Sequence, residues 1–294
     1  MSKDEIIFTD LDLDGCCSYL AYSWLTQTRS KAITIKVSNL REKFLAWLKR
    51  NKLSDYKTVY FFDLDTTEIK DLIDKKNVTI FDHHKSHDEK YKNATTIIDK
   101  ECTSCSKLIY RHYKNSANLT NEQKKLIALA NDYDCYELKF PESNKLNFLL
   151  WYKNGDKLQN FINDFETGFH GFTNDQNKII SYHFYKFKKI RDSVILYKST
   201  LKIAGKEYKF ISTFGNEYVN DLCQYIIDNN DCDVCLMINL KNNRVYLRKN
   251  RTVELNLGKF AQKICDGGGH EYAAGGKLNE TVLALSKKFV PVNG

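Results

Sequence analysis

The sequence predicts an α/β protein, with a parallel sheet in its first half and a smaller α+β domain towards its C-terminus. In the first 85 residues, apolar runs of four to six residues alternate with segments of helical periodicity. Beyond about residue 103 the pattern is helical, and after about residue 200 strand pairs with turn signals appear. Short apolar runs separated by helices indicate βαβ units, whose parallel strands are covered by helices on both faces.

The elements of the first half follow one another in regular alternation. Strands are expected at Ile6 to Thr9, Ala32 to Val37, Thr58 to Phe62 and Val78 to Phe81. Helices are expected between them at Gly15 to Thr28, Arg41 to Asn51 and Glu68 to Lys75. Further helices are expected within residues 103–114, 121–137, 145–153 and 158–166.

A long amphipathic stretch at residues 175–199 is interpreted as a linker helix. The 294 residues are enough for two domains. We therefore expect a catalytic, metal-binding domain at 1–174 and a substrate-binding domain at 200–294, with strand pairs in residues 200–213 and 234–248. Clefts between domains are common ligand sites, so the active site is expected there.

Composition excludes several classes of protein. The N-terminus lacks the pattern of a signal peptide, and no apolar stretch approaches the length of about 18 residues that spans a membrane. Nine cysteines, an odd number, indicate reduced thiols in a cytoplasmic protein, and two CxxC pairs are interpreted as ordinary buried thiols. The net charge of +8 suits a polyanionic partner. Nothing in the sequence specifies an oligomer.

Acidic and histidine side chains follow the predicted strands. The stretch "IIFTDLDLDGCCSYLAY" places three acids directly after the first strand, and other candidates follow later strands or end a helical segment. The full set is Asp10, Asp12, Asp14, Asp63, Asp82, His83, His84, Asp132 and Asp134. The carboxyl ends of parallel strands share one edge of a sheet, so these groups can converge. Taken singly, Asp10, Asp63 or Asp134 would be interpreted as a helix cap or a solvated loop residue.

Together these side chains predict a site for divalent metal, because bound cations offset the repulsion among crowded carboxylates. Carboxylates with one or two imidazoles suit manganese, magnesium or iron better than an ion that prefers thiolates. The predicted set contains more anionic ligands than one ion needs. Two ions about 4 Å apart can hold a phosphate oxygen and activate a water.

A glycine-rich segment, "DGGGHEYAAGGK", occupies residues 266–277. Gly267, Gly268 and Gly269 allow close approach of a ligand to the backbone, and His270 adds a donor for phosphate. Arg248, in the preceding strand, can pair with a second phosphate or a carboxylate. The alternative for the glycines alone is a flexible turn, but a metal site elsewhere in the chain favours a phosphate clamp.

The ordered set of motifs resembles the DHH phosphoesterase superfamily, in its RecJ-like and nanoRNase-like branch with a DHH-associated C-terminal domain. The motifs are "DLDLDG" at 10–15, "FFDLD" around Asp63, "DHH" at 82–84, "IALAND" ending at Asp132, and "GGGHEYAAGG" at 267–276. The segment "IIDKECTSCSKLIY" is also similar to the connecting helix of that family. The resemblance spans nearly the whole chain.

The resemblance implies a set of residue roles. It implies a first ion on Asp12 and Asp63, and a second on Asp14, Asp63, His83 and Asp132, with Asp63 bridging the two. His84 would then face the phosphate, and Asp10 would support the first ion or orient its water, although this chain has Phe8 where some members carry a histidine. Two Mn2+ ions are implied, with Mg2+ as the alternative, and phosphate recognition by Arg248 and residues 267–270.

The expected function is manganese-dependent hydrolysis of phosphodiester or phosphomonoester bonds in nucleotides or short single-stranded oligonucleotides. The length resembles that of the compact nanoRNase members, since larger exonucleases of the superfamily carry an additional nucleic-acid-binding domain. Two alternatives stay open. One is cleavage of a cyclic dinucleotide or its linear product, and the other is a binding protein that has lost the chemistry.

Overall fold

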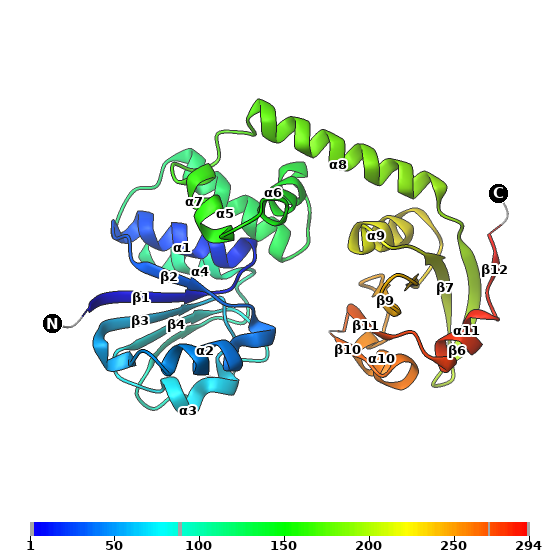
Figure 1. Ribbon diagram of the computed structural model, residues 1–294, viewed down its shortest axis with the longest axis horizontal. Coiled ribbons are helices and arrows are strands. Elements are labelled where there is room, and N and C mark those ends of the chain that lie inside the picture. Colours follow the sequence, from blue (N-terminus) through cyan, green and yellow to red (C-terminus); the bar gives the residue numbers. More distant parts are fainter. Residues whose placement is uncertain (1–2, 88–89, 270, 293–294) are drawn as a thin grey trace. The chain divides into compact units, whose positions relative to one another are not determined.

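The computed structural model describes residues 3–87, 90–269 and 271–292 (Figure 1). The chain divides into two compact units, Met1–Ile180 and Ser181–Gly294. The division falls inside helix α8 (Asn174–Ser193), within the segment that the sequence predicts as a linker helix. None of the helices in the described parts of the chain combines the length and apolar character needed to cross a membrane.

The first unit contains a five-stranded sheet in the order β2-β1-β3-β4-β5. All neighbouring strands are parallel, which confirms the predicted α/β class. Its strands are β1 (Lys3–Thr9), β2 (Lys31–Thr34), β3 (Tyr56–Phe62), β4 (Val78–Asp82) and β5 (Thr95–Ile98). The edge strand β5 is absent from the sequence prediction, because its four residues, Thr-Thr-Ile-Ile, are only partly apolar.

Helices cover both faces of this sheet, as Figure 1 shows. One face shares a core with α1 (Leu13–Thr26), α4 (Cys105–Tyr113), α5 (Asn121–Asp134), α6 (Pro141–Tyr152) and α7 (Lys157–Phe165). The other packs against α2 (Leu40–Leu48) and α3 (Lys70–Ile73). Because side chains alternate along a strand, Phe62 joins the first core while Phe61 joins the second. Short 3-10 turns occur at Val37–Asn39, Leu53–Asp55 and Thr67–Ile69.

The second unit contains a seven-stranded mixed sheet in the order β10-β11-β9-β8-β7-β6-β12. Only the β7–β8 pair is parallel among its described neighbours. The strands are β6 (Tyr197–Ile203), β7 (Lys206–Phe214), β8 (Val234–Asn239), β9 (Arg244–Lys249), β10 (Gly268–Gly269), β11 (Ala273–Lys277) and β12 (Val290–Pro291). The helices are α9 (Val219–Asn229), α10 (Leu257–Cys265) and α11 (Glu280–Ser286).

The predicted linker helix extends too far at its C-terminal end. Helix α8 ends at Ser193, and residues 197–199 already belong to strand β6. A tight turn at Ala204 and Gly205, with φ of 50° and 88°, joins β6 to β7 in a hairpin. Such two-residue turns need positive φ, which glycine adopts without strain.

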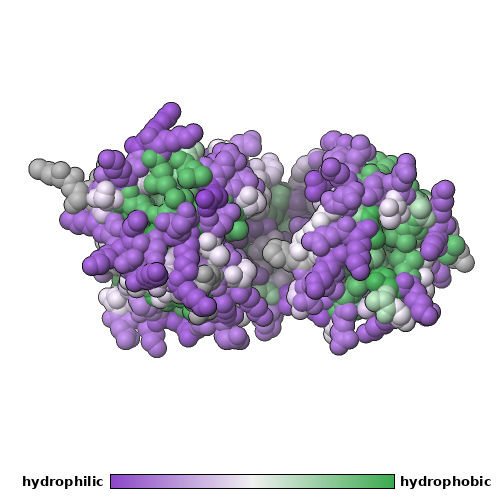
Figure 2. All heavy atoms as spheres, turned by 90° about the horizontal axis from the view of Figure 1, so that it is seen from below, coloured by the Kyte–Doolittle hydropathy of each residue, from purple (hydrophilic) through white to green (hydrophobic). Residues whose placement is uncertain are grey.

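The face of the molecule shown in Figure 2 is mostly polar. On the side shown in Figure 2, hydrophilic residues cover much of each unit, with smaller hydrophobic patches between them. All nine cysteines are free, and every one except the half-buried Cys135 is buried. The cysteines therefore behave as small apolar core residues, as the sequence predicts.

Candidate metal centre

The ends of three neighbouring strands bring acidic loops to one edge of the parallel sheet. Asp10 follows β1, Asp63 follows β3, and Asp82 is the last residue of β4. Strand β3 pairs with both β1 and β4, and the Asp63 N–H donates to the Phe81 carbonyl. The convergence predicted from strand topology is therefore present at this edge.

His83 lies at the centre of the acidic cluster. Its Nε2 atom is 3.2 Å from Asp63 Oδ1, 3.3 Å from Asp134 Oδ2 and 4.0 Å from Asp14 Oδ2. Two ligands of one ion, each at about 2.1 Å and at right angles, lie roughly 3 Å apart. The spacing around His83 thus fits side chains that share a cation.

Two groups of side chains in the described residues could each hold an ion. The first contains Asp63, His83 and His84, and the second contains Asp14, His83 and Asp134. In each group the ligand atoms lie within 4.8 Å of one another. The groups share His83, so the structure brings five side chains to one centre.

Asp63 gives the most direct indication of a missing cation. Its side chain is 2% exposed, and none of the described residues donates a hydrogen bond to its Oδ1 atom. Its backbone has φ of 57°, a left-handed conformation that is uncommon for residues other than glycine. A buried carboxylate oxygen without a hydrogen bond is costly unless a cation satisfies it, and strained backbone often marks functional sites. The residues present therefore fit a divalent metal.

Asp12 and Asp14 lie at the start of helix α1, and each accepts backbone hydrogen bonds. The Asp12 side chain caps the helix by accepting from the Gly15 N–H at 2.8 Å. Asp14 is buried and accepts from the backbone N–H groups of Cys105 and Ser106, in the first turn of α4. A Cβ atom on Gly15 would lie 2.3 Å from the Asp10 carbonyl oxygen. The glycine in "DLDLDG" is therefore needed for the close approach of this loop to the helix.

Burial and mutual repulsion perturb the carboxylates of the cluster. Burial, followed by the charges of Asp14 and Asp12, raises the pKa of Asp63 well above its ordinary value. The pKa of Asp134 is raised by burial and by the same two neighbours. Burial and the charge of Asp12 raise the pKa of Asp10 to about 7. Burial and crowding thus raise the pKa of all three carboxyl groups, and bound cations would offset both effects.

Asp82 organises two histidines and is itself fully buried. His84 Nδ1 lies 2.7 Å from Asp82 Oδ1, and His87 Nδ1 contacts Asp82 Oδ2. Burial acts to raise the pKa of Asp82, but the two histidines hold it below its ordinary value. Burial opposes charging of His84, yet the hydrogen bond and charge of Asp82 raise the pKa of His84 to about 9. His87 lies outside the DHH triplet, and no motif in the sequence singles it out.

The structure brings Asp134, rather than Asp132, next to His83. The Asp132 carboxylate points the other way and accepts from Lys139 N at 2.9 Å, Phe140 N at 3.1 Å and Ser143 Oγ at 2.7 Å. Residues two apart on a helix lie on nearly opposite faces, so only one of the pair can face the cluster. Asp132 instead holds the loop that leads into α6.

This difference predicts opposite results for two substitutions. Asp132→Ala should destabilise the metal-free protein by about 3 kcal/mol, because it leaves buried donors unpaired. Asp134→Ala should leave that stability unchanged or raise it, yet weaken Mn2+ binding. Urea unfolding and calorimetric Mn2+ titration measure the two effects. A stable Asp132→Ala variant that fails to bind Mn2+ would contradict this assignment.

The glycine-rich segment forms a hairpin in the second unit. Strand β10 pairs with β11, and β11 pairs with β9 so that Ala273 lies opposite Arg248. A Cβ on Gly267 would lie 2.0 Å from the Gly275 carbonyl oxygen, and Gly269 has φ of 140°. A Cβ on Gly268 would meet no described atom within 4 Å beyond its chain neighbours. Backbone packing thus explains Gly267 and Gly269, but not Gly268.

Arg248 and His270 are the other residues of the second unit that the sequence predicts to bind phosphate. Arg248 is half-buried, and its guanidinium donates to the Leu247 carbonyl at 2.9 Å and to Asn220. The buried Lys249 donates to the Val253 carbonyl at 2.6 Å and to Glu271 at 3.0 Å, and so holds the segment after β10. His270 lies outside the described residues.

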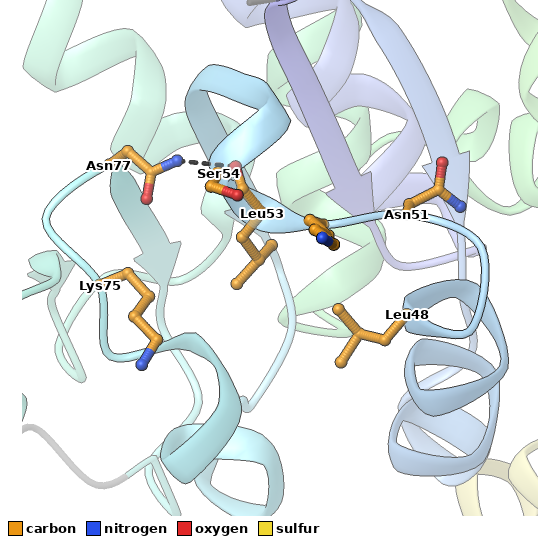
Figure 3. A pocket seen from close by; sticks show the side chains of 7 residues that line it. Leu48, Asn51, Leu53, Ser54, Lys75 and Asn77 are labelled. Atoms are coloured by element: carbon orange, nitrogen blue, oxygen red, sulfur yellow. Dashed lines mark hydrogen bonds between the residues drawn. The ribbon is translucent and has the colours of Figure 1, made fainter.

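A pocket in the first unit lies at the N-terminal ends of the strands, opposite the ends that carry the acidic cluster. It is lined by Leu48, Asn51, Lys52, Leu53, Ser54, Lys75 and Asn77 (Figure 3). These residues precede β3 and β4, whereas Asp63 and His83 follow them. The seven residues of β3 span roughly 20 Å, so this pocket is separate from the acidic cluster. In its lining, the Asn77 side chain donates to the Leu53 carbonyl at 2.9 Å.

Comparisons with known proteins agree with this fold. The family model described as "DHH family, N-terminal domain" matches residues 5–131. A pGpG-specific phosphodiesterase, PggH from Vibrio cholerae, is similar over 97% of each chain, with a TM-score of 0.64 and 14% identity. Exonuclease RecJ bound to manganese matches over 97% of this chain and 88% of its own, with a TM-score of 0.56 and 12% identity. The search of curated proteins found no match.

Proposed function

We propose that the chain is a divalent-metal-dependent phosphoesterase, from the match of residues 5–131 to the DHH family model and from the geometry of the cluster. The proposal rests on one observation above all. The buried Asp63 carboxylate has an oxygen without a hydrogen-bond donor, 3.2 Å from His83 and within reach of a second carboxylate group. That arrangement suits cations that in turn bind phosphate.

The side chains divide into ligands and supporting groups. Asp14, Asp63, His83 and Asp134 would hold one ion, with Asp12 and Asp10 beside them for a second. Bound divalent ions would offset the charge of a phosphoryl group and activate a water for attack on phosphorus. His84, fixed by Asp82 and protonated near neutral pH, would donate a hydrogen bond to a phosphate oxygen or to the leaving group.

We propose that the substrates are short single-stranded oligonucleotides or dinucleotides and that the physiological ion is Mn2+. The net charge of +8 favours an anionic substrate, although the metal-binding end of the first unit is itself acidic. Arg248, Gly268 and His270 are the candidates for phosphate contacts in the second unit. Linear dinucleotides are included because PggH, which shares the fold, is described as specific for pGpG.

A binding protein without catalytic activity is the alternative from another class. Such a protein would have no need of a buried, unpaired Asp63 oxygen or of a His84 imidazole held by a fully buried carboxylate. The convergence of Asp14, Asp63, His83 and Asp134 in this chain favours the enzyme. Mg2+ in place of Mn2+ would alter the activity but leave the proposed chemistry in place.

The direct test is a panel of labelled substrates with purified full-length protein. It contains pGpG, other dinucleotides, oligonucleotides of four to twelve nucleotides in RNA and DNA, a cyclic dinucleotide and a nucleoside bisphosphate. Each is incubated with Mn2+, with Mg2+ and with EDTA. We expect mononucleotide release that depends on Mn2+ and stops with EDTA. Binding of RNA with no product under any condition would instead favour the binding protein.

Gly268 supplies a further test of substrate contact. Gly268→Ala should leave the free energy of unfolding within about 0.5 kcal/mol of wild type, because the added methyl group has room. If the substrate approaches this backbone, the same methyl group should raise KM about ten-fold. Gly267→Ala is the matched control, since its methyl group collides with the hairpin and should destabilise the fold. Steady-state kinetics that are unchanged in Gly268→Ala would remove this residue from the substrate site.

A further inference from the structure

The exposed side of helix α8 carries a repeated pairing of tyrosine with lysine. The Tyr182 and Tyr185 side chains are 60% and 54% exposed, which is unusual for rings of this size. Lys186 Nζ lies 4.8 Å from the centroid of the Tyr182 ring, and Lys189 Nζ lies 4.7 Å from that of Tyr185. Both pairs are spaced four residues apart, so they follow one face of the helix.

The opposite side of the helix is already packed. Phe187 and Ile190 contact the core formed by α9 and the inner face of the mixed sheet. At 3.6 residues per turn, Phe187 lies roughly across the helix from the paired tyrosines and lysines, and Ile190 lies at the side between them. The tyrosines are therefore not needed for the core, and they form a solvent-facing stripe together with their lysines.

The stripe has a positive charge and little apolar surface. Between Ser181 and Ser193 the helix contains Lys186, Lys188, Lys189 and Arg191 against a single acid, Asp192. No exposed aliphatic side chain accompanies the two tyrosines in this part of the helix. Arg191 lies outside the stripe, because it stacks over Tyr225 of α9, with its guanidinium carbon 4.8 Å from the ring centroid, and pairs with Asp192 at 2.7 Å.

We propose that this stripe, formed by Tyr182, Tyr185, Lys186 and Lys189, binds single-stranded nucleic acid. The inference rests on the proposed function, which it deepens by adding a contact for longer substrates. Aromatic rings stack on bases without strong sequence preference, and lysines contact the phosphates between them. Rings three residues apart are offset by about 4.5 Å along the helix, which allows successive bases to use successive rings.

The chemistry of the stripe favours nucleic acid over a membrane surface. A helix that lies in a membrane interface inserts an apolar face, usually with Trp, Phe or Leu, between the lipids. Here Phe187 and Ile190 of α8 pack against the core of the second unit, and no exposed Trp, Phe or Leu lies in residues 181–193. The stripe therefore has the two features of a surface that binds a single strand, which are rings that stack on bases and cations that bind phosphates.

Binding of a fluorescent twelve-nucleotide single strand, measured by anisotropy in EDTA to prevent hydrolysis, tests the proposal. The double variant Tyr182→Ala/Tyr185→Ala should bind about ten-fold more weakly or worse, whereas Tyr182→Phe/Tyr185→Phe should bind like wild type. Lys186→Gln/Lys189→Gln should lower the slope of log affinity against log salt by about 1.4. The control Lys198→Gln/Lys202→Gln, on the exposed side of β6, removes equal charge and should change little.

Equal losses in the control and stripe variants, or wild-type binding by the alanine variant, would overturn the proposal. Binding of the stripe to phosphatidylserine vesicles without binding to the oligonucleotide would also overturn it, in favour of a membrane contact. Hydrolysis of a dinucleotide separates this result from the proposed function. Stripe variants should cleave it at the wild-type rate while KM for the twelve-mer rises. A different outcome is that wild type cleaves no substrate while the stripe variants still lose binding to the twelve-mer. That result would contradict the proposed catalytic function and support the stripe as a nucleic-acid contact.

Discussion

Replacing Asp63 by asparagine is expected to lower kcat/KM at least about 10³-fold, which corresponds to roughly 4 kcal/mol of transition-state stabilisation. The substitution keeps the shape of the side chain but removes the negative charge that faces His83. An amide oxygen is a weaker ligand for a divalent ion than a carboxylate is. Steady-state hydrolysis of a dinucleotide with saturating Mn2+ gives the measurement.

The same substitution should stabilise the metal-free protein while it disables the enzyme. Asp63 is buried beside the charges of Asp14, Asp12 and Asp134, so neutralising it relieves repulsion that no cation offsets. We expect a gain of about 1 kcal/mol in EDTA, together with loss of the stabilisation that Mn2+ gives wild type. At a free ion concentration of 100 Kd that stabilisation is about 2.7 kcal/mol.

Asp71→Asn is the matched control for this experiment, since Asp71 is exposed on α3 of the same unit. It should change neither activity nor the response to Mn2+. If Asp63→Asn lost stability in EDTA, its carboxylate would be a structural group rather than a metal ligand. Full activity in this variant would remove Asp63 from the centre altogether.

The order of strands and helices in the first unit was predictable because buried parallel strands are continuous apolar runs. Strand β4 (Val78–Asp82) is such a run, and its predicted and observed bounds differ by one residue. Strand β5 (Thr95–Ile98) escaped prediction because an edge strand is half solvated and carries Thr95 and Thr96. Local pattern therefore predicts the centre of a sheet better than its edge.

The choice between Asp132 and Asp134 shows where motif matching alone is insufficient. Both acids end the same helix, and the resemblance to the family selected Asp132. The periodicity of α5 contains the better signal, because Leu126 and Ala130 are buried and Asp134 continues their spacing of four residues. Asp132 belongs to another face, where its partners are backbone N–H groups of a loop with positive φ at Tyr136 and Leu138. No local pattern predicts that loop conformation.

The role of the glycine-rich segment was only partly predictable for a related reason. Successive glycines indicate close backbone approach, but the sequence does not say whether the approaching group is a ligand or the chain itself. The hairpin formed by β10 and β11 accounts for Gly267 and Gly269. Long-range pairing of this kind depends on which strands become neighbours, and it leaves Gly268 as the residue with a functional explanation.

The stability of the metal-free protein is expected to fall as the pH rises from about 5 to 8. Asp10 has an ordinary pKa of 3.8 that is raised to about 7 in the folded protein. Between these values the folded state binds more protons than the unfolded state, so each increase in pH favours unfolding. His84 acts in the same direction. Its raised pKa, about 9, gives stability that is complete below about 6.5 and is lost as the pH rises through 9.

Bound Mn2+ should reverse much of this trend, because the ions require carboxylates without protons and their affinity therefore rises with pH. Thermal unfolding at pH 5, 6, 7 and 8, in EDTA and in MnCl2, measures the difference. We expect Tm in EDTA to fall by about 5 °C or more across this range, and the increment due to Mn2+ to be smallest at pH 5. In EDTA, the Asp10→Asn variant should lose less Tm than wild type between pH 5 and 7. Above pH 7, where His84 titrates, its Tm should fall with pH as in wild type. An increment that is constant with pH would mean that the ions bind without displacing protons from the cluster, which is incompatible with a centre built from these carboxylates.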